Sequence, residues 1–203
     1  KAVDETKPLI YCSAGSHQDY CNGRIRLFRA LIESLEARPH FQGIIQVWNK
    51  EEINNLKPLP VNMIIVEAAP QVEVLSRAHL FITHGGLSSV RESIFCGVPM
   101  IVFPWGFEQP GNSARIMYHH LGLRGDILQV TGETLGRLID KISNDFSYHK
   151  SVKQMQKKFQ EQESCEKGIS FIESMIATSI TKTGRDQQVK SLAAAEERIV
   201  IEI

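Results

Sequence analysis

Apolar residues along this chain fall into short continuous runs that alternate with longer amphipathic segments. The first run, Pro8–Ser13, predicts a buried strand, because a strand covered on both faces is apolar throughout. The segment from Arg24 to Leu35 instead spaces its apolar residues three and four positions apart, as on one face of a helix. Four more strands are expected at Phe41–Trp48, Val61–Val66, Leu80–Thr83 and Val98–Phe103.

Helical segments separate these strands, and glycine and proline mark their ends. Pro70 is expected to open a short helix, because proline is tolerated in the first turn of a helix. A second helix is expected from Ser88 to Phe95, with Gly97 ending it, since glycine readily adopts the left-handed conformation found there. The remaining helices are expected at Gly111–Leu121, ended at Gly122, and at Gly132–Ile142, Tyr148–Glu163 and Cys165–Ile180.

This alternation of strands and helices predicts an α/β fold, a Rossmann-like parallel sheet with helices on both faces. Ligands of such sheets bind at the carboxyl ends of the strands. Residues 1–180 are expected to form this domain. After residue 180 the sequence turns polar and loses its periodicity, so 181–203 is interpreted as a loosely ordered polar tail.

Composition narrows the class of protein. The 203 residues are 42% hydrophobic, which suits one globular domain, and the net charge of +0 gives no sign of nucleic acid or an anionic membrane as partner. The longest apolar stretch, Ile94 to Phe107, is interrupted by Gly97, Pro99 and Pro104. A membrane-spanning helix needs about 20 apolar residues, so no span is expected.

The cysteines and the first residues indicate the cellular compartment that is expected for this protein. No two cysteines form a C-x-x-C pair, which favours reduced thiols and a cytoplasmic protein. The chain starts with Lys1 rather than methionine and shows no signal peptide, so residue 1 is interpreted as not the native start. The cysteines are Cys12, Cys21, Cys96 and Cys165.

The segment Phe81–Glu92 carries the most specific chemistry. An apolar strand runs into two glycines and then into a helix, so that backbone amides at the helix start can approach an anion closely. Ser88 and Ser89 add hydroxyl donors, and His84 stands at the end of the strand. The pattern predicts an anion site that needs no lysine, because the helix dipole supplies the positive charge.

Each of these features also has a purely structural interpretation. Two glycines between a strand and a helix are common in tight connections. Ser89 and Glu92 have the spacing of a capping box, in which Ser89 would cap the helix and Glu92 would reach back to its start. His84, taken alone, is interpreted as a hydrogen-bonded structural residue. The local pattern leaves these alternatives open.

A longer match favours the functional interpretation. It comprises, in order, Ala69-Pro70-Gln71, Leu75, Phe81-Ile82-Thr83-His84-Gly85-Gly86, Ser89, Glu92, Gly97-Val98-Pro99-Met100, Pro104, Glu108-Gln109 and Asn112-Ser113-Ala114. This series resembles the donor-binding signature of the UDP-glycosyltransferases, which include plant, animal and bacterial macrolide and carotenoid enzymes. A weaker resemblance extends over Pro8 to Asp145.

The resemblance implies a role for each matched position. Ala69 and Gln71 would lie along the nucleoside, and Glu92 would accept hydrogen bonds from the ribose diol, which suits a carboxylate. Glu108 and Gln109 would hold hydroxyls of the transferred sugar. The other nucleotide-sugar-binding positions are the first-strand end at Gly15 and Ser16 and, around the diphosphate, His84, Gly86, Leu87, Ser88 and Ser89.

Some positions depart from the family. Ala68 stands where many members have a tryptophan that stacks on uracil, so another residue supplies that surface or none does. The base is expected to be uridine, with thymidine as the alternative. Ser88 replaces the signature's asparagine. Trp105 is interpreted as packing near the donor sugar, and Trp48 as core or rim packing.

As a whole, the resemblance implies the C-terminal half of a GT-B glycosyltransferase, an enzyme of two Rossmann-like domains. It would transfer a hexose such as glucose from a UDP-sugar, with inversion and without a metal or cofactor, to a small-molecule or lipid-like hydroxyl acceptor. The catalytic base, a His–Asp pair in family members, would lie in the N-terminal acceptor-binding domain. This chain would then carry no catalytic residue and be inactive alone.

Three other functions compete with this one. In the first alternative, the chain is the donor subunit of a two-chain N-acetylglucosaminyltransferase of the dolichol pathway. Glu108-Gln109 and Ala69-Pro70-Gln71 fit the single-chain family better. In the second, the chain is a nucleotide-sugar-binding module without catalysis. A UDP-sugar epimerase also has two such domains, but its motif order differs.

Overall fold

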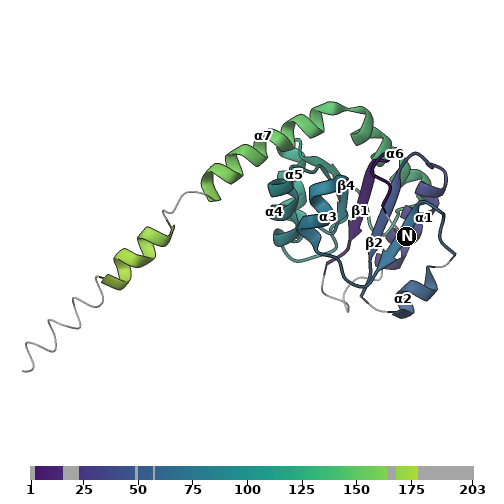
Figure 1. Ribbon diagram of the computed structural model, residues 1–203, viewed down its shortest axis with the longest axis horizontal. Coiled ribbons are helices and arrows are strands. Elements are labelled where there is room, and N and C mark those ends of the chain that lie inside the picture. The colour runs from purple at the N-terminus through teal and green to yellow at the C-terminus, as the bar shows by residue number, and fades with distance from the viewer. Residues whose placement is uncertain (1–2, 16–22, 49, 57, 164–167, 178–203) are drawn as a thin grey trace, which may run out of the picture. The chain divides into compact units, whose positions relative to one another are not determined.

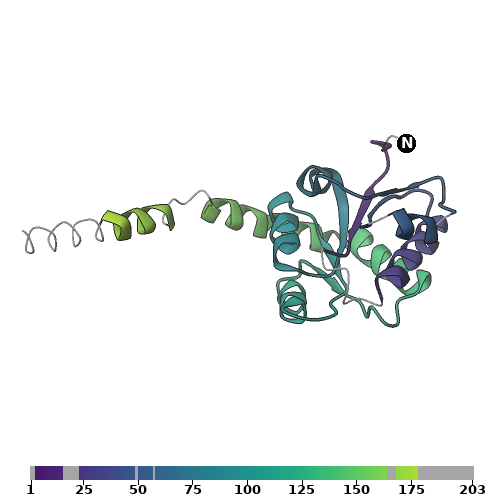
Figure 2. The same cartoon turned by 90° about the horizontal axis from the view of Figure 1, so that it is seen from below.

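A computed structural model describes residues 3–15, 23–48, 50–56, 58–163 and 168–177. The chain divides into two units, Lys1–Gln160 and Glu161–Ile203. The first is built on one six-stranded parallel sheet in the order β3-β2-β1-β4-β5-β6 (Figures 1 and 2). The strands are β1 (Leu9–Ser13), β2 (Gln42–Gln46), β3 (Met63–Val66), β4 (Ala78–Thr83), β5 (Met100–Val102) and β6 (Gly122–Arg124).

Helices cover both faces of this sheet, as the alternating pattern predicts. Helices α1 and α6 pack on one face, and α3, α4 and α5 pack on the other. Helix α7 contributes to both cores, with Tyr148 in the first and Val152 in the second. A short helix, α2, connects β2 to β3. The helices are α1 (Arg24–Glu36), α2 (Lys50–Asn55), α3 (Gln71–Arg77), α4 (Leu87–Cys96), α5 (Gln109–Tyr118), α6 (Gly132–Asn144) and α7 (Phe146–Glu163).

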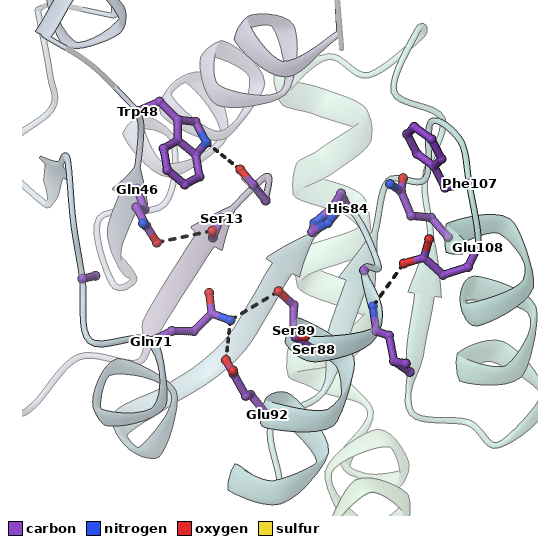
Figure 3. A pocket seen from close by; sticks show the side chains of 15 residues that line it. Ser13, Gln46, Trp48, Gln71, His84, Ser88, Ser89, Glu92, Phe107 and Glu108 are labelled. Atoms are coloured by element: carbon purple, nitrogen blue, oxygen red, sulfur yellow. Dashed lines mark hydrogen bonds between the residues drawn. The ribbon is translucent and has the colours of Figure 1, made fainter. Parts of the chain in front are cut away.

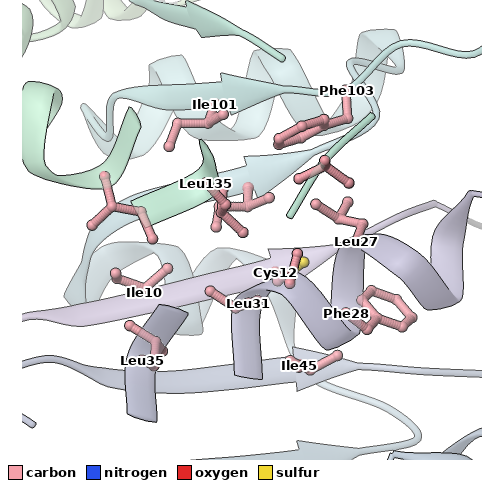
Figure 4. Close-up of a cluster of buried hydrophobic side chains, with 14 of the residues drawn as sticks. Ile10, Cys12, Leu27, Phe28, Leu31, Leu35, Ile45, Ile101, Phe103 and Leu135 are labelled. Atoms are coloured by element: carbon pink, nitrogen blue, oxygen red, sulfur yellow. The ribbon is translucent and has the colours of Figure 1, made fainter. Parts of the chain in front are cut away.

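Strand β1 explains why the apolar runs lack alternation. Ile10 and Cys12 belong to the core under α1 and α6, whereas Leu9 and Tyr11 belong to the core under α3, α4 and α5. Successive side chains of a strand point to opposite faces, so a strand between two helical layers must be apolar at every position. Figure 4 shows the first core, where Phe28 and other α1 side chains lie over Ile10 and Cys12.

Most predicted elements are present, and the differences lie at Gly122, at strand β6 and at helix α2. Gly97 ends α4 in the left-handed conformation, with φ of 69°, as expected. Gly122 was expected to end the preceding helix, which is wrong: α5 ends at Tyr118, and Gly122 begins β6. A Cβ at Gly122 would lie 1.9 Å from the carbonyl oxygen of Met100, so glycine is needed where β6 meets β5. Helix α2 was not expected.

The C-terminal part of the first unit is held by α7. Val152 is buried in the core under α4, and the Gln156 side-chain amide donates to the Phe95 carbonyl at 2.6 Å. The Lys153 ammonium also donates to the Cys96 carbonyl at 3.4 Å, so α7 satisfies two carbonyls at the end of α4.

In the second unit, residues 168–177 are helical, within the expected Cys165–Ile180 segment. Their apolar side chains, among them Ile169 and Phe171, are exposed. The predicted tail at 181–203 lies outside the described residues, and the predicted domain boundary at residue 180 stays a prediction. In the part of the chain that the structure describes, no helix has both the length and the apolar character to cross a membrane.

Core packing gives a first prediction. Leu31 is fully buried between α1 and the sheet, so Leu31→Ala should lower the free energy of unfolding by about 2–5 kcal/mol. Urea unfolding followed by circular dichroism measures it. Ile169→Ala is the matched control, because Ile169 is 60% exposed and should change stability by less than about 0.5 kcal/mol. Equal losses in both variants would contradict the packing described.

A partly buried histidine gives a second prediction. Burial lowers the pKa of His79 to about 4, with a further contribution from His149, whose ring centroid lies 4.5 Å away. The unfolded chain therefore binds more protons than the folded chain between about pH 6.5 and 4, and stability should fall as the pH falls through that window.

The test compares melting temperatures between pH 7 and pH 4.5 for the wild type and His79→Phe, which keeps a ring but cannot titrate. The variant should lose less stability on acidification. The exposed His119 provides the control, because His119→Phe should keep the wild-type slope. A His79→Phe slope equal to that of the wild type would refute the assignment.

Candidate nucleotide-sugar site

A cavity of about 550 Å³ opens at the carboxyl ends of the central strands (Figure 3). Ser13 is the last residue of β1, Gln46 is the last of β2, and His84 follows β4; all three line it. The cavity lies beside the junction of β1 and β4, where the strand order reverses direction, which is where open α/β sheets bind ligands. Its volume is in the usual range for small-molecule sites.

The cavity brings together every predicted binding residue except Ser16, which lies outside the described residues. Four lining residues were not predicted to bind. The predicted residues that line the cavity are Gly15, Ala69, Gln71, His84, Gly86, Leu87, Ser88, Ser89, Glu92, Glu108 and Gln109, and the additional ones are Ser13, Gln46, Trp48 and Phe107.

The turn between β4 and α4 aims a helix start at the cavity. Gly85 has φ of 88°, in the region that favours glycine, and Gly86 is the extended residue that precedes α4. Among the described residues, no side chain caps this helix. The Leu87 amide donates to a carboxylate oxygen of Glu108 at 3.4 Å. The start of α4 therefore already accommodates an anionic oxygen.

His84 stands in a slot between glycines. A Cβ at Gly15 would lie 2.5 Å from its ring, and a Cβ at Gly86 would lie 2.4 Å from its Nε2. The ring also stacks on Trp105, with centroids 4.9 Å apart and planes at 24°. Trp105 thus packs on His84, one layer behind the pocket wall that the ring forms. The two glycines and the indole together fix the imidazole beside the start of α4.

A polar triad forms one side of the cavity. The Gln71 amide nitrogen donates to Glu92 Oε2 at 2.6 Å and to Ser89 Oγ at 3.3 Å (Figure 3). The capping-box interpretation is wrong, because Gly86 precedes α4 and Ser89 is its third residue. Ser89 and Glu92 instead lie one turn apart on the face of α4 toward Gln71 and the cavity.

Tyr11 supports this triad from below the cavity. Its hydroxyl donates to Gln46 Oε1 at 2.6 Å and lies 3.4 Å from Gln71 Oε1. Burial raises the pKa of Tyr11, so the phenol stays a neutral donor at physiological pH. One buried hydroxyl therefore positions two cavity amides, from β2 and α3.

The segment before α5 closes the opposite side. Phe107 and Glu108 are exposed at the cavity, whereas Gln109 is buried and accepts a hydrogen bond from the Trp105 amide at 3.0 Å. The buried side-chain amide of Asn112 donates to the Gly85 carbonyl at 2.9 Å. The Glu108-Gln109 pair is therefore divided: Glu108 faces solvent and the helix start, and Gln109 orders the loop. Asn112 ties the start of α5 to the glycine turn.

The unpredicted lining residues gave little local signal. Ser13 and Gln46 are the last residues of strands, which was the one available clue. Trp48 was interpreted as core or rim packing; it lines the cavity, and its indole nitrogen donates to the Gly15 carbonyl at 2.5 Å. Phe107 has φ of 54°, a conformation unusual for a large side chain. No sequence pattern predicts this conformation or the position of Phe107 at the cavity.

The cavity has a defined order of charges. Its lining contains two carboxylates, Glu92 and Glu108, and among the described lining residues none is lysine or arginine. The positive end of the α4 dipole and the ring of His84 lie between these two carboxylates. An anion is thus favoured only beside the helix start, and groups that donate hydrogen bonds are favoured on either side of it.

Comparison with known proteins agrees with this fold. The family described as UDP-glucoronosyl and UDP-glucosyl transferase matches residues 30–174. The NDP-glycosyltransferase YjiC of Bacillus subtilis is 33% identical over 175 residues, covering 86% of this chain and 44% of YjiC.

Solved structures show the same fold. The glycotransferase of kitacinnamycin superposes with a TM-score of 0.76 at 25% identity, covering 84% of this chain and 43% of that one. Os79 from O. sativa, in complex with UDP and deoxynivalenol-3-glucoside, superposes with a TM-score of 0.64 at 22% identity, covering 76% and 38%.

The architecture is that of one half of a GT-B glycosyltransferase. The chain belongs to the UDP-glucoronosyl and UDP-glucosyl transferase family, which confirms the resemblance found in the sequence from Ala69 to Ala114. It spans less than half the length of YjiC, the curated relative described above.

The glycine turn gives a third prediction. Gly85→Ala places a Cβ 2.5 Å from Val102 Cγ1 at a positive φ, so it should lower the free energy of unfolding by about 1–3 kcal/mol. Gly111→Ala, in α5, meets nothing within 4 Å and should cause no loss. Urea unfolding of both variants measures the difference. A Gly85→Ala protein as stable as the wild type would contradict the turn geometry.

Proposed function

We propose that this chain binds a UDP-sugar in the cavity at the start of α4 and is the donor-binding domain of an inverting, metal-independent glycosyltransferase. The observation that carries the proposal is the Gln71–Glu92 pair one turn beyond the uncapped start of α4. This arrangement matches the order of ribose and diphosphate in a nucleotide.

The diphosphate belongs at the start of α4. The amides of its first turn, the hydroxyls of Ser88 and Ser89, and the ring of His84 face the cavity together. These groups donate hydrogen bonds and supply about half a positive charge from the helix dipole. That Leu87 already donates to Glu108 supports the binding of a stronger anion there.

The ribose belongs beside Glu92. A carboxylate would repel phosphate, but it accepts two hydrogen bonds from a diol. Glu92 lies about 5 Å along the helix from the first turn, at 1.5 Å rise per residue. Gln71 holds the carboxylate at 2.6 Å and keeps its own position through Tyr11. The two side chains therefore form a prepositioned acceptor for the sugar diol.

The transferred sugar belongs on the other side of the start of α4, near Glu108. Its carboxylate lies at the cavity and accepts from the Leu87 amide in the structure described here. A bound diphosphate would take over that amide and release Glu108 for hydroxyls of the sugar. Gln109 contributes by ordering the loop through the Trp105 amide. The proposed sugar is a hexose such as glucose, as the family resemblance implies.

The proposed reaction is a direct displacement. The oxygen of an acceptor hydroxyl attacks the anomeric carbon, and the bond from that carbon to the diphosphate oxygen breaks with inversion. Negative charge develops on the departing UDP, where the α4 amides and His84 stabilise it without reorganising. The hydroxyl proton passes to a general base. The acceptor is proposed to be a small-molecule or lipid-like alcohol.

That base is proposed to lie in an N-terminal acceptor-binding domain, the second partner of this site. The relatives' greater length supports such a domain, since YjiC is more than twice as long as the match. This chain alone should then bind UDP and transfer no sugar. Os79, of the same fold, is described in complex with UDP, which supports that nucleotide as the first probe.

The fourth prediction tests the site. Calorimetry should detect UDP binding by the wild-type chain, and His84→Ala and Glu92→Ala should each weaken it by about 10- to 150-fold, the loss of a hydrogen bond to a charged group. Glu92→Ala should leave the affinity for inorganic pyrophosphate unchanged, because pyrophosphate lacks ribose. Tyr118→Ala is the control, since this exposed ring lies outside the cavity.

Binding should also raise the melting temperature. A ligand at 100 times its dissociation constant adds about 2.7 kcal/mol of stability to the folded state. No binding at millimolar UDP, or wild-type affinity in both site variants, would refute the proposed function.

A further inference from the structure

One aromatic side chain of the cavity has no role in the site as assigned above. Trp48 follows the end of β2 and is half-buried at the cavity wall, on the side of Gln46 and Ser13. Its indole N–H donates to the Gly15 carbonyl at 2.5 Å, which joins the segment after β2 to the segment after β1. The ring therefore has a fixed orientation.

The chemistry of this wall differs from that of the rest of the cavity. The indole N–H is bonded to the Gly15 carbonyl, so the part of the Trp48 ring that lines the cavity is carbon. Such a surface suits a flat, weakly polar group and neither a phosphate nor a sugar diol. In the same region Ala68, directly before the cavity residue Ala69, has no ring to offer.

The position of Trp48 completes a sequence of subsites. In Figure 3, Trp48 and, below it, Gln71 and Glu92 lie toward one side of the cavity, His84 lies near the middle, and Glu108 lies at the far side. A nucleotide-sugar has the same order: base, ribose, diphosphate and sugar. Phe107, the other large apolar aromatic of the lining, lies at the Glu108 side, away from the ribose position.

We propose that the face of the Trp48 indole is the platform on which the nucleotide base stacks. The inference rests on the proposed function and adds to it the residue that binds the base. Stacking accepts any base, because every base has a π face. Trp48 therefore contributes affinity for the nucleoside and leaves the choice of base to hydrogen-bonding groups around the platform.

The experiment measures dissociation constants of UDP, ADP and inorganic pyrophosphate by calorimetry on the full 203-residue chain. Trp48→Ala should weaken both nucleotides by a similar factor, about 5- to 150-fold, and should leave pyrophosphate unchanged. Trp48→Phe keeps an aromatic face without the N–H and should stay within about fivefold of the wild type for UDP. Tyr118→Ala serves again as the control ring.

A spectroscopic measurement keeps the test decisive if Trp48→Ala does not fold. The chain has two tryptophans, Trp48 and Trp105. UDP should quench the fluorescence of the wild type, and Trp48→Phe should lose most of that quenching while it still binds UDP. Uridine, which lacks phosphate, should quench the wild type at higher concentration, whereas pyrophosphate should not.

The outcomes separate this inference from the proposed function. If the wild type binds UDP and Trp48→Ala binds it equally well, the inference alone is overturned. If Trp48→Ala weakens pyrophosphate as much as UDP, Trp48 only supports the Gly15 segment, and the inference is again overturned. If the wild type binds no UDP, the proposed function fails and the inference fails with it.

Discussion

The site depends on the turn that joins β4 to α4. With Gly85 left-handed and Gly86 extended, the helix starts directly at the edge of a central strand, beside the place where the sheet reverses its winding. The described residues of the cavity lining include no lysine or arginine, so the positive end of the α4 dipole, beside His84, is where an anion is favoured. Acidic and amide side chains can then be specific for hydroxyls, because the anion has only one favourable position.

The fold was largely predictable because burial determines it. Strands such as β1 are covered on both faces, so their continuous apolar runs stand out in the sequence, as does the apolar face of α1. Strand β6 was missed because three residues, Gly122–Arg124, carry no pattern and exist as a strand only through pairing with β5. Helix α2 is polar and short, so its residues show no helical period.

The residues that line the cavity were predictable where they are contiguous or carried by a family signature. His84, Ser89 and Glu92 lie within one strand–turn–helix segment, so the local sequence pattern predicts them. Local sequence alone could not decide which residue precedes α4, so it left the capping-box alternative open; in the structure that residue is Gly86. Trp48 joins the site only through the parallel pairing of β2 with β1, which no local pattern encodes.

The anchoring of α5 divides the rim of the cavity into a fixed part and a variable part. Gln109 and Asn112 are buried and hold the Trp105 amide and the Gly85 carbonyl, whereas Phe107 and Glu108, directly before Gln109, are exposed. Substitutions at the exposed positions leave the anchoring hydrogen bonds intact. If the subsites are those proposed above, substitutions at the exposed positions during evolution can change which sugar is accepted. The nucleotide-binding part of the cavity then stays the same.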